Sequence, residues 1–195
     1  MFDEGLHAYL RHSRDAIEAA IEAVPEAAME AAVEACTTAL GEGLPMLVCG
    51  NGGSAADAMH ITGELVGRFL RERRALNAVC LSSNPSVLTA WANDYSYETV
   101  FARQVEAYGK AGGAVLGIST SGNSPNVLRA VEVANEAGAT SVGFAGYGGG
   151  KLAERARMSV VVDRRNMQQV EDLHMILGHI VFSALRDRIK GLLRP

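Results

Sequence analysis

From residue 43 onward, short uninterrupted apolar runs alternate with longer stretches that have the periodicity of helices. The runs are MLVC (46–49), LNAVCL (76–81), AVLGIS (114–119), SVGFAG (141–146) and MSVVVD (158–163). A strand that is apolar at every position is covered on both faces, as in a parallel sheet whose crossover helices lie on either side. The sequence therefore predicts an α/β fold with a five-stranded parallel sheet flanked by helices.

The first 42 residues have a different pattern. Ala, Ile, Leu and Val recur there every three or four positions among Glu and Arg, which is typical of helices, and Val24-Pro25 interrupts the pattern. We expect two helices joined near Pro25, forming an arm (1–42) that pairs with helices of another subunit. A last helix is expected from about 167 to 193. No linker is visible, so residues 1–195 are interpreted as one domain with its α/β core at 43–195.

Composition excludes several classes of protein. Among the 195 residues the net charge is −4, which argues against the basic face of a nucleic-acid binder. No apolar stretch approaches the roughly 20 residues that cross a bilayer, and no signal peptide is visible. Cys36, Cys49 and Cys80 lie in apolar stretches and are expected to be buried, reduced thiols. We expect a soluble cytoplasmic protein with neither a membrane nor a nucleic-acid partner.

Two predicted loops carry the residue types that bind anions. The loop CGNGGSAADAMH (49–60) follows the first strand, and its glycines let the backbone approach a ligand, while Ser54 is expected to cap the next helix. The loop STSGNS (119–124) follows the third strand and ends where a helix begins at Pro125. Helix N-termini carry unpaired amides and a positive dipole end, so hydroxyls and amides there predict a phosphate cradle. Its hydroxyls belong to Ser119, Thr120, Ser121 and Ser124.

A nucleotide site is the competing interpretation of the glycine-rich loop. The segment GNGGSA fits the dinucleotide fingerprint, but such a site needs an acidic residue at the end of the second strand to hold the ribose. The second strand ends in LSSN (81–84), which has no carboxylate, and no Lys follows the glycines as in a Walker loop.

Imidazole and carboxylate groups mark two helices. His60 and Glu64 are four residues apart and share one helix face. On the last helix, His179 lies among apolar residues, where an imidazole needs a partner or a ligand. Glu171 and His174 share a face there, and His174 is expected to pack or to cap, whereas Glu171 and His179 are separated by a rise of roughly 12 Å.

These segments together resemble the sugar isomerase (SIS) domain family, and more narrowly the phosphoheptose isomerases. The resemblance rests on CGNGGSAADAMH, STSGNS, AWANDY (90–95) and HMILGHI (174–180), and it covers nearly the whole chain. It implies a flavodoxin-like fold, a homotetramer with active sites between subunits, and the conversion of sedoheptulose 7-phosphate to D-glycero-D-manno-heptose 7-phosphate for surface polysaccharide.

The resemblance also implies roles for individual residues. The substrate would contact Asn51, Gly52, Gly53, Ser54, Asn93 and Asp94, and its phosphate would be held by Ser119, Thr120, Ser121 and Ser124. One divalent metal per subunit, zinc in the family, would be bound by His60, Glu64, Glu171 and His179. Glu171, also expected to contact substrate, stands where the family usually has glutamine. The added charge bears on both metal and substrate preference.

The chemistry of an aldose–ketose isomerase requires a base beside a carbon and an acid near the oxygens of an enediol. We assign Glu64 as the base and His179 as the acid. A non-catalytic SIS binding module, such as those attached to a replication initiator, lacks this pair. A phosphosugar-sensing regulator usually carries a DNA-binding module, for which 195 residues leave no room. An isomerase of a different sugar phosphate remains an alternative.

Overall fold

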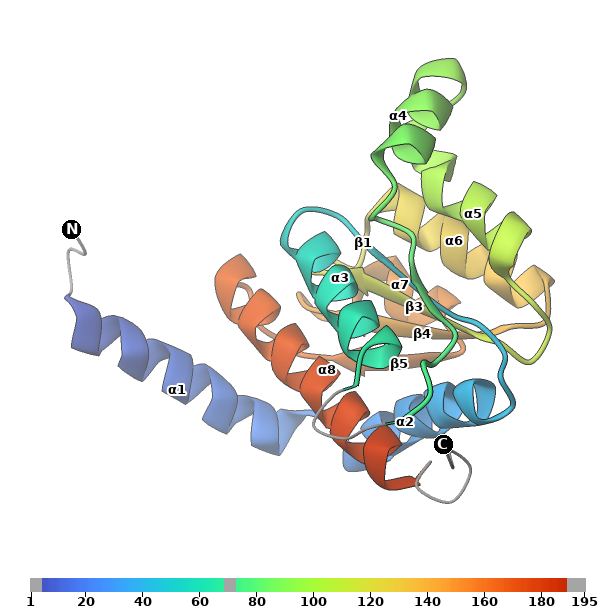
Figure 1. Ribbon diagram of the computed structural model, residues 1–195. Helices are drawn as coiled ribbons and strands as arrows, with labels where there is room; N and C mark the ends of the chain where they lie inside the picture. The colour runs from blue at the N-terminus through green and yellow to red at the C-terminus, as the bar shows by residue number, and fades with distance from the viewer. Residues whose placement is uncertain (1–4, 69–72, 189–195) are drawn as a thin grey trace.

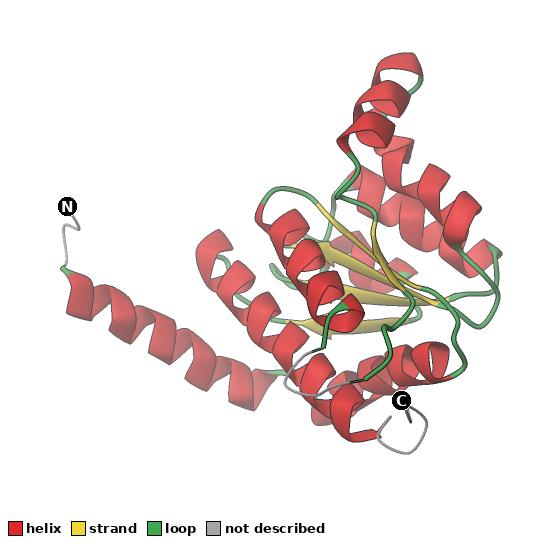
Figure 2. Ribbon diagram, in the orientation of Figure 1, coloured by secondary structure: helices red, strands yellow, loops and turns green. Residues whose placement is uncertain are grey.

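The computed structural model describes residues 5–68 and 73–188 and shows a single parallel sheet with helices on both faces (Figures 1 and 2). Its strands are β1 (Met46–Gly50), β2 (Ala78–Cys80), β3 (Ala114–Ser119), β4 (Thr140–Ala145) and β5 (Met158–Val161). They lie in the order β2-β1-β3-β4-β5, and every neighbouring pair is parallel. The predicted five-stranded parallel α/β fold is confirmed.

The second strand is shorter than the sequence predicted for 76–81. The amide of Leu76 donates to the carbonyl of Leu65 at 3.2 Å, so it is bonded to the preceding helix rather than to β1. Only three residues of this segment pair with β1 as a ladder.

The helices follow the predicted alternation with the strands. They are α1 (Leu6–Ala23), α2 (Glu26–Gly41), α3 (Gly53–Val66), α4 (Pro85–Asp94), α5 (Val100–Tyr108), α6 (Pro125–Glu136), α7 (Gly150–Arg155) and α8 (Met167–Arg188), with a 3₁₀ turn η1 (Tyr97–Thr99) before α5. The predicted break near Pro25 is confirmed, because α1 ends and α2 begins around it. The predicted last helix is confirmed to Arg188, and its expected end at 189–193 lies outside the described residues. Among the described helices, none combines the length and apolar character needed to cross a bilayer.

The sheet separates two apolar layers. Met46 and Val48 of β1 face a layer built with α2, α3 and α8. Leu47 and Cys49, the alternate residues of the same strand, face a layer built with α5, α6 and α7. The continuous apolar strands are therefore covered on both sides, as their sequence predicted. All three cysteines are buried and free of disulfides.

Helix α1 differs from the others because it extends beside α8, away from the sheet (Figure 1). Of its described residues only Ala16 is buried. Its large apolar side chains remain exposed, and they belong to Leu6, Leu10, Ile17 and Ile21. Their spacing of four, seven and four residues places them on one face of the helix. The expectation that this arm pairs with another subunit remains a prediction.

His174 on α8 is part of the packed core, as the sequence predicted. It is fully buried, its ring lies 6.0 Å from that of Phe144, and both ring nitrogens lack a hydrogen-bond partner. Burial lowers the pKa of His174 to about 4, and the nearby carbonyl of Ala145 opposes this shift without a hydrogen bond of normal geometry. The fold therefore holds this imidazole neutral.

This buried imidazole predicts a specific loss of stability in acid. Because the pKa is lower in the folded than in the unfolded chain, the stability present above about pH 6.5 is lost as the pH falls toward 4. The loss attributable to His174 is about 3 kcal/mol. We expect His174→Leu to remove it, so that urea midpoints measured from pH 7.5 to 4.5 fall less than in the wild type. The exposed His7→Leu is the control, and an unchanged acid limb in His174→Leu would contradict the prediction.

Candidate active site

The two predicted ligand loops lie next to each other at one edge of the sheet. Strands β1 and β3 are direct neighbours, with Gly50 paired to Ile118. The chain leaves β1 toward β2 on one side and leaves β3 toward β4 on the other. Ligands of open α/β sheets bind at such a switch point, outside the carboxyl ends of the strands. Residues 51–54 and 119–124 therefore share the position where this fold binds ligands.

The first loop makes a tight turn into α3. A side chain at Gly50 would place its Cβ 2.7 Å from the Cβ of Ser54, and Gly52 has φ +54°, so both positions favour glycine. Gly52 is the N-cap of α3, with no side-chain cap. Ser54 lies within the first turn and is buried, so the expectation that it caps the helix is wrong. Because no side chain caps this N-terminus, it can receive polar groups of a ligand.

The second loop gathers its hydroxyls at the N-terminus of α6. The Oγ atoms of Ser119 and Ser124 lie 2.9 Å apart, and Ser124 is the N-cap residue without using its hydroxyl as a cap. Ser121 Oγ accepts the main-chain N–H of Asn123 at 3.2 Å. Thr120 lies between them and is half-buried. These hydroxyls, beside a helix N-terminus, are suited to an anion such as a phosphoryl group.

Backbone packing fixes the shape of the second loop. Gly122 has φ +65°, and a Cβ there would overlap the carbonyl group of Gly149. The Gly122 carbonyl also accepts the N–H of Leu152 at 2.8 Å. The second loop is thus packed directly on the loop between β4 and α7.

Asn51 is held by two other segments. Its side-chain amide exchanges two hydrogen bonds of 2.8 Å with the amide of Asn126, and its Oδ1 also accepts the Tyr97 hydroxyl at 2.9 Å. The sequence reasoning did not identify Asn126 or Tyr97. Asn126 had one usable signal, its position as a polar residue in the first turn of the helix directly after the serine-rich loop; Tyr97 had none.

His60 and His179 are brought together from α3 and α8. Their Nε2 atoms are 3.3 Å apart, and the rings meet edge to face with centroids 5.3 Å apart. Both residues are exposed, so the expectation of an apolar setting for His179 is wrong, although its ring does pack against Phe182 at 5.8 Å. Two imidazoles bound to one tetrahedral zinc, each at 2.0–2.1 Å, have nitrogens about 3.3 Å apart. The histidine pair therefore fits such an ion.

Glu64 lies one turn beyond His60 and is half-buried. The guanidinium of Arg73 donates to its main-chain carbonyl at 2.7 Å. Burial lowers the pKa of Arg73, while the charge of Glu64 raises it, which shows that carboxylate and guanidinium interact. Arg73 thus neutralises the C-terminal end of α3. In residues 5–68 and 73–188 no three His, Cys, Asp or Glu side chains are arranged to hold a metal, so Glu64 and Glu171 do not join the histidine pair.

Glu171 lies against the first loop instead. A Cβ on Gly53 would be 2.6 Å from its Oε2, so a larger residue at position 53 would require this carboxylate to move. Asp57, one turn along α3, is buried, and its Oδ2 lacks a partner. Burial, and then the charges of Glu171 and Asp172, raises the pKa of Asp57 to about 6. Negative charge therefore accumulates where α8 meets the N-terminal half of α3.

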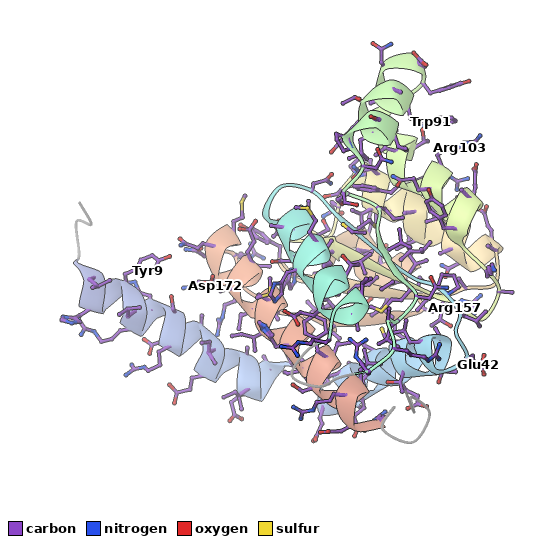
Figure 3. All side chains as sticks on the ribbon, viewed as in Figure 1. Tyr9, Glu42, Trp91, Arg103, Arg157 and Asp172 are labelled. Carbon is purple, nitrogen blue, oxygen red and sulfur yellow. The ribbon has the colours of Figure 1, made fainter. Side chains whose placement is uncertain are left out.

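Asn93 and Asp94 stand apart from the two loops. Both are exposed at the end of α4, which extends away from the sheet, and Asn93 Nδ2 donates to Asp94 Oδ1 at 2.8 Å (Figure 1). In the last turn of this helix, the Trp91 ring centroid lies 4.8 Å from the Arg103 guanidinium (Figure 3). Trp91 Nε1 donates to Thr99 at 2.8 Å, which ties α4 to η1. The expected contact of Asn93 and Asp94 with substrate stays a prediction.

Comparison with known proteins agrees with this arrangement. The SIS domain family matches residues 8–146. A phosphoheptose isomerase of Aquifex aeolicus (strain VF5) is 47% identical over 152 residues, covering 78% of this chain and 80% of the relative. The structure of phosphoheptose isomerase GmhA from Neisseria gonorrhoeae superposes with a TM-score of 0.84 at 34% identity, covering 93% and 96% of the two chains. A phosphoheptose isomerase from Francisella tularensis gives a TM-score of 0.88 at 31% identity, with the same coverage.

The resemblance predicted from the loop and helix motifs is confirmed by sequence over most of the chain and by structure over nearly all of it. This chain belongs to the SIS domain family and, within it, to the phosphoheptose isomerases.

Proposed function

We propose that the protein interconverts sedoheptulose 7-phosphate and D-glycero-D-manno-heptose 7-phosphate, a ketose–aldose isomerisation that supplies heptose for surface polysaccharide. The observation that carries this proposal is the pairing of two loops at the switch point of the sheet. One offers hydroxyls at a helix N-terminus for the phosphate, and the other leads into the helix that carries His60 and Glu64. Membership in the phosphoheptose isomerases supports the choice of sugar.

In this proposal Ser119, Thr120, Ser121 and Ser124 hold the phosphate. Glu64 removes a proton from C1 of the ketose, the electrons of that C–H bond form the C1–C2 double bond, and His179 gives a proton to O2. Loss of the O1 proton and return of a proton to C2 complete the aldose. Asn51, Gly52, Gly53 and Ser54 line the sugar, with Asn93 and Asp94 reaching it from α4.

A divalent metal, which we take to be zinc, belongs to the same proposal. His60 and His179 would hold it through Nε2, and the 3.3 Å separation of these atoms supports this; His179 would then give its proton to O2 from Nδ1. Glu64 and Glu171 would complete the ligand set only after movement of their side chains. When bound, the ion would polarise a sugar oxygen. Glu171 is a carboxylate at a position where the family usually has glutamine, whose amide is uncharged. The added negative charge favours retention of a cation and disfavours an anionic group of the substrate nearby.

A homotetramer is also part of the proposal. The exposed stripe on α1 is one apolar surface that lacks a partner within the described chain. A second group of exposed apolar side chains lies on α3 and α8, the helices that carry the histidine pair, and consists of Met59, Val66, Ile176 and Ile180. Covering the second surface with another subunit would enclose His60 and His179, as expected for active sites between subunits. Light scattering on the purified protein should give the mass of four chains, and a monomer would exclude this arrangement.

We place the protein in the cytoplasm. Its three cysteines are buried and unpaired, and burial raises the pKa of Cys36 and Cys49 to about 12, so both stay as unreactive thiols.

The proposed activity is tested by following purified protein with sedoheptulose 7-phosphate by NMR, alongside metal analysis. We expect an aldose C1 resonance to appear, and we expect chelator treatment to abolish it and zinc to restore it. Activity that survives complete metal removal would reject the metal while leaving the isomerase assignment intact. Inertness of the metal-loaded protein toward sedoheptulose 7-phosphate, with phosphosugar binding retained, would instead favour a non-catalytic binding module.

A further inference from the structure

Three segments of the chain meet at the side chain of Asn51. The first is its own loop after β1, the second is the start of α6, which carries Asn126, and the third is η1, which carries Tyr97. Asn126 is two residues beyond Ser124, the last hydroxyl of the second loop. Bonds at Asn51 therefore connect the loop expected to contact the sugar with the loop expected to hold the phosphate.

Asn126 has features that simple packing does not require. It is only 2% exposed and lies among apolar residues of α6. A buried amide is costly unless its groups are hydrogen-bonded. Its Oδ1 accepts both Asn51 Nδ2 and the N–H of Val127, at 2.8 and 3.0 Å, and its Nδ2 donates to Asn51 Oδ1 at 2.8 Å. The polar cost of burying Asn126 is thus offset largely through Asn51.

The pattern of bonds also determines what Asn51 can offer a ligand. Its Oδ1 already accepts two donors, from Asn126 and Tyr97, and a carbonyl oxygen has two lone pairs. One Nδ2 hydrogen is used for Asn126, and the amide nitrogen carries two. The remaining group is one N–H, which is a donor to an oxygen. Because two parallel bonds fix the plane of the amide, this donor has a fixed direction.

We propose that Asn126 is a positioning residue that, with Tyr97, orients Asn51 to donate its remaining N–H to an oxygen of the sugar chain, at a fixed spacing from the phosphate loop. The proposal rests on the proposed function, because it takes a sugar phosphate as the ligand. Asn126 acts through Asn51 and does not touch the substrate itself.

The first test is Asn126→Ala. Loss of the orienting bonds should raise KM for sedoheptulose 7-phosphate about tenfold, the effect of one well-formed hydrogen bond, with a smaller change in kcat. Inhibition by inorganic phosphate should change by less than about twofold, because Asn126 is proposed to act through Asn51 and not through the hydroxyls of the second loop. Asn135→Ala is the matched control on the same helix; its amide bonds the Arg155 carbonyl and Ser141, and KM should stay unchanged.

A double-mutant cycle separates positioning from general damage. Dissociation constants for sedoheptulose 7-phosphate are measured by calorimetry for Asn51→Ala, Asn126→Ala and their combination, all in a Glu64→Gln background that does not convert the ligand. We expect the double variant to bind no worse than Asn51→Ala, because the effect of Asn126 passes through Asn51. The proposal would be overturned if the fold-changes in dissociation constant caused by Asn51→Ala and Asn126→Ala multiplied in the double variant. An unchanged KM in a folded Asn126→Ala variant would also overturn it.

Tyr97→Phe provides a second route if Asn126→Ala does not fold. Tyr97 is 55% exposed, so loss of its hydroxyl leaves the core intact. We expect a two- to fivefold weaker affinity that disappears in the Asn51→Ala background, in line with one partly exposed hydrogen bond. A Tyr97→Phe effect that persists without Asn51 would contradict the proposal. A wild-type protein that binds the sugar phosphate without isomerising it would overturn the proposed function, and the binding cycle would still decide this inference.

Discussion

Glu64→Gln is expected to lower kcat by about 10³-fold while the affinity for sedoheptulose 7-phosphate changes only a few-fold. The amide has the size of the carboxylate but cannot accept the C1 proton, and a general base contributes roughly 10²–10⁴-fold. The loop proposed to hold the phosphate, residues 119–124, precedes α6, whereas Glu64 is on α3. Phosphate binding should therefore persist. The measurement is steady-state kinetics together with calorimetric binding.

Zinc content separates the two roles assigned to Glu64. If Glu64→Gln retains the metal and loses turnover, the carboxylate acts as the base. If metal and turnover are lost together and added zinc restores both, Glu64 is a ligand and the base lies elsewhere. Glu106→Gln, an exposed carboxylate paired with Arg103, is the control and should leave kcat unchanged. More than a tenth of wild-type kcat in Glu64→Gln would remove Glu64 from the catalytic step.

Gly122→Ala is expected to destabilise the fold by about 3–5 kcal/mol and to abolish phosphate binding. An alanine with φ +65° costs about 1–2 kcal/mol, and its Cβ would also overlap the Gly149 carbonyl group, so one of the two loops must move. Movement of 119–124 would separate the hydroxyls of Ser119 and Ser124. Urea unfolding and phosphate inhibition measure the two effects.

Gly43→Ala is the matched control for the cost of placing an alanine at a positive φ. Gly43 has a similar φ of +76°, but nothing lies within 4 Å of the position its Cβ would take. Its replacement should cost only about 1–2 kcal/mol and leave phosphate binding intact. Equal destabilisation by the two substitutions would mean that the contact with Gly149 does not hold the loop.

The fold could be predicted largely from the sequence because its signals are local. Apolar runs that have no polar alternation can be satisfied only between two layers of helices, and Pro25 breaks the arm wherever the rest of the chain packs. The two ligand loops were predicted for the same reason, since glycine and hydroxyl residues directly after a strand have few other uses. The error at the start of β2 came from a hydrogen bond between Leu76 and Leu65, eleven residues apart, that no local pattern contains.

The sequence by itself determined the parallel α/β architecture, the two ligand loops and the residue types available for catalysis. Only the tertiary structure decided which of them meet. It placed His60 and His179 with their Nε2 atoms 3.3 Å apart, turned Glu171 toward Gly53, and left Asn93 and Asp94 at the exposed end of α4. It also left His179 exposed, although its neighbours along the chain are apolar. Helix periodicity fixes the face on which a residue lies, but the neighbours of that face depend on how separate helices pack.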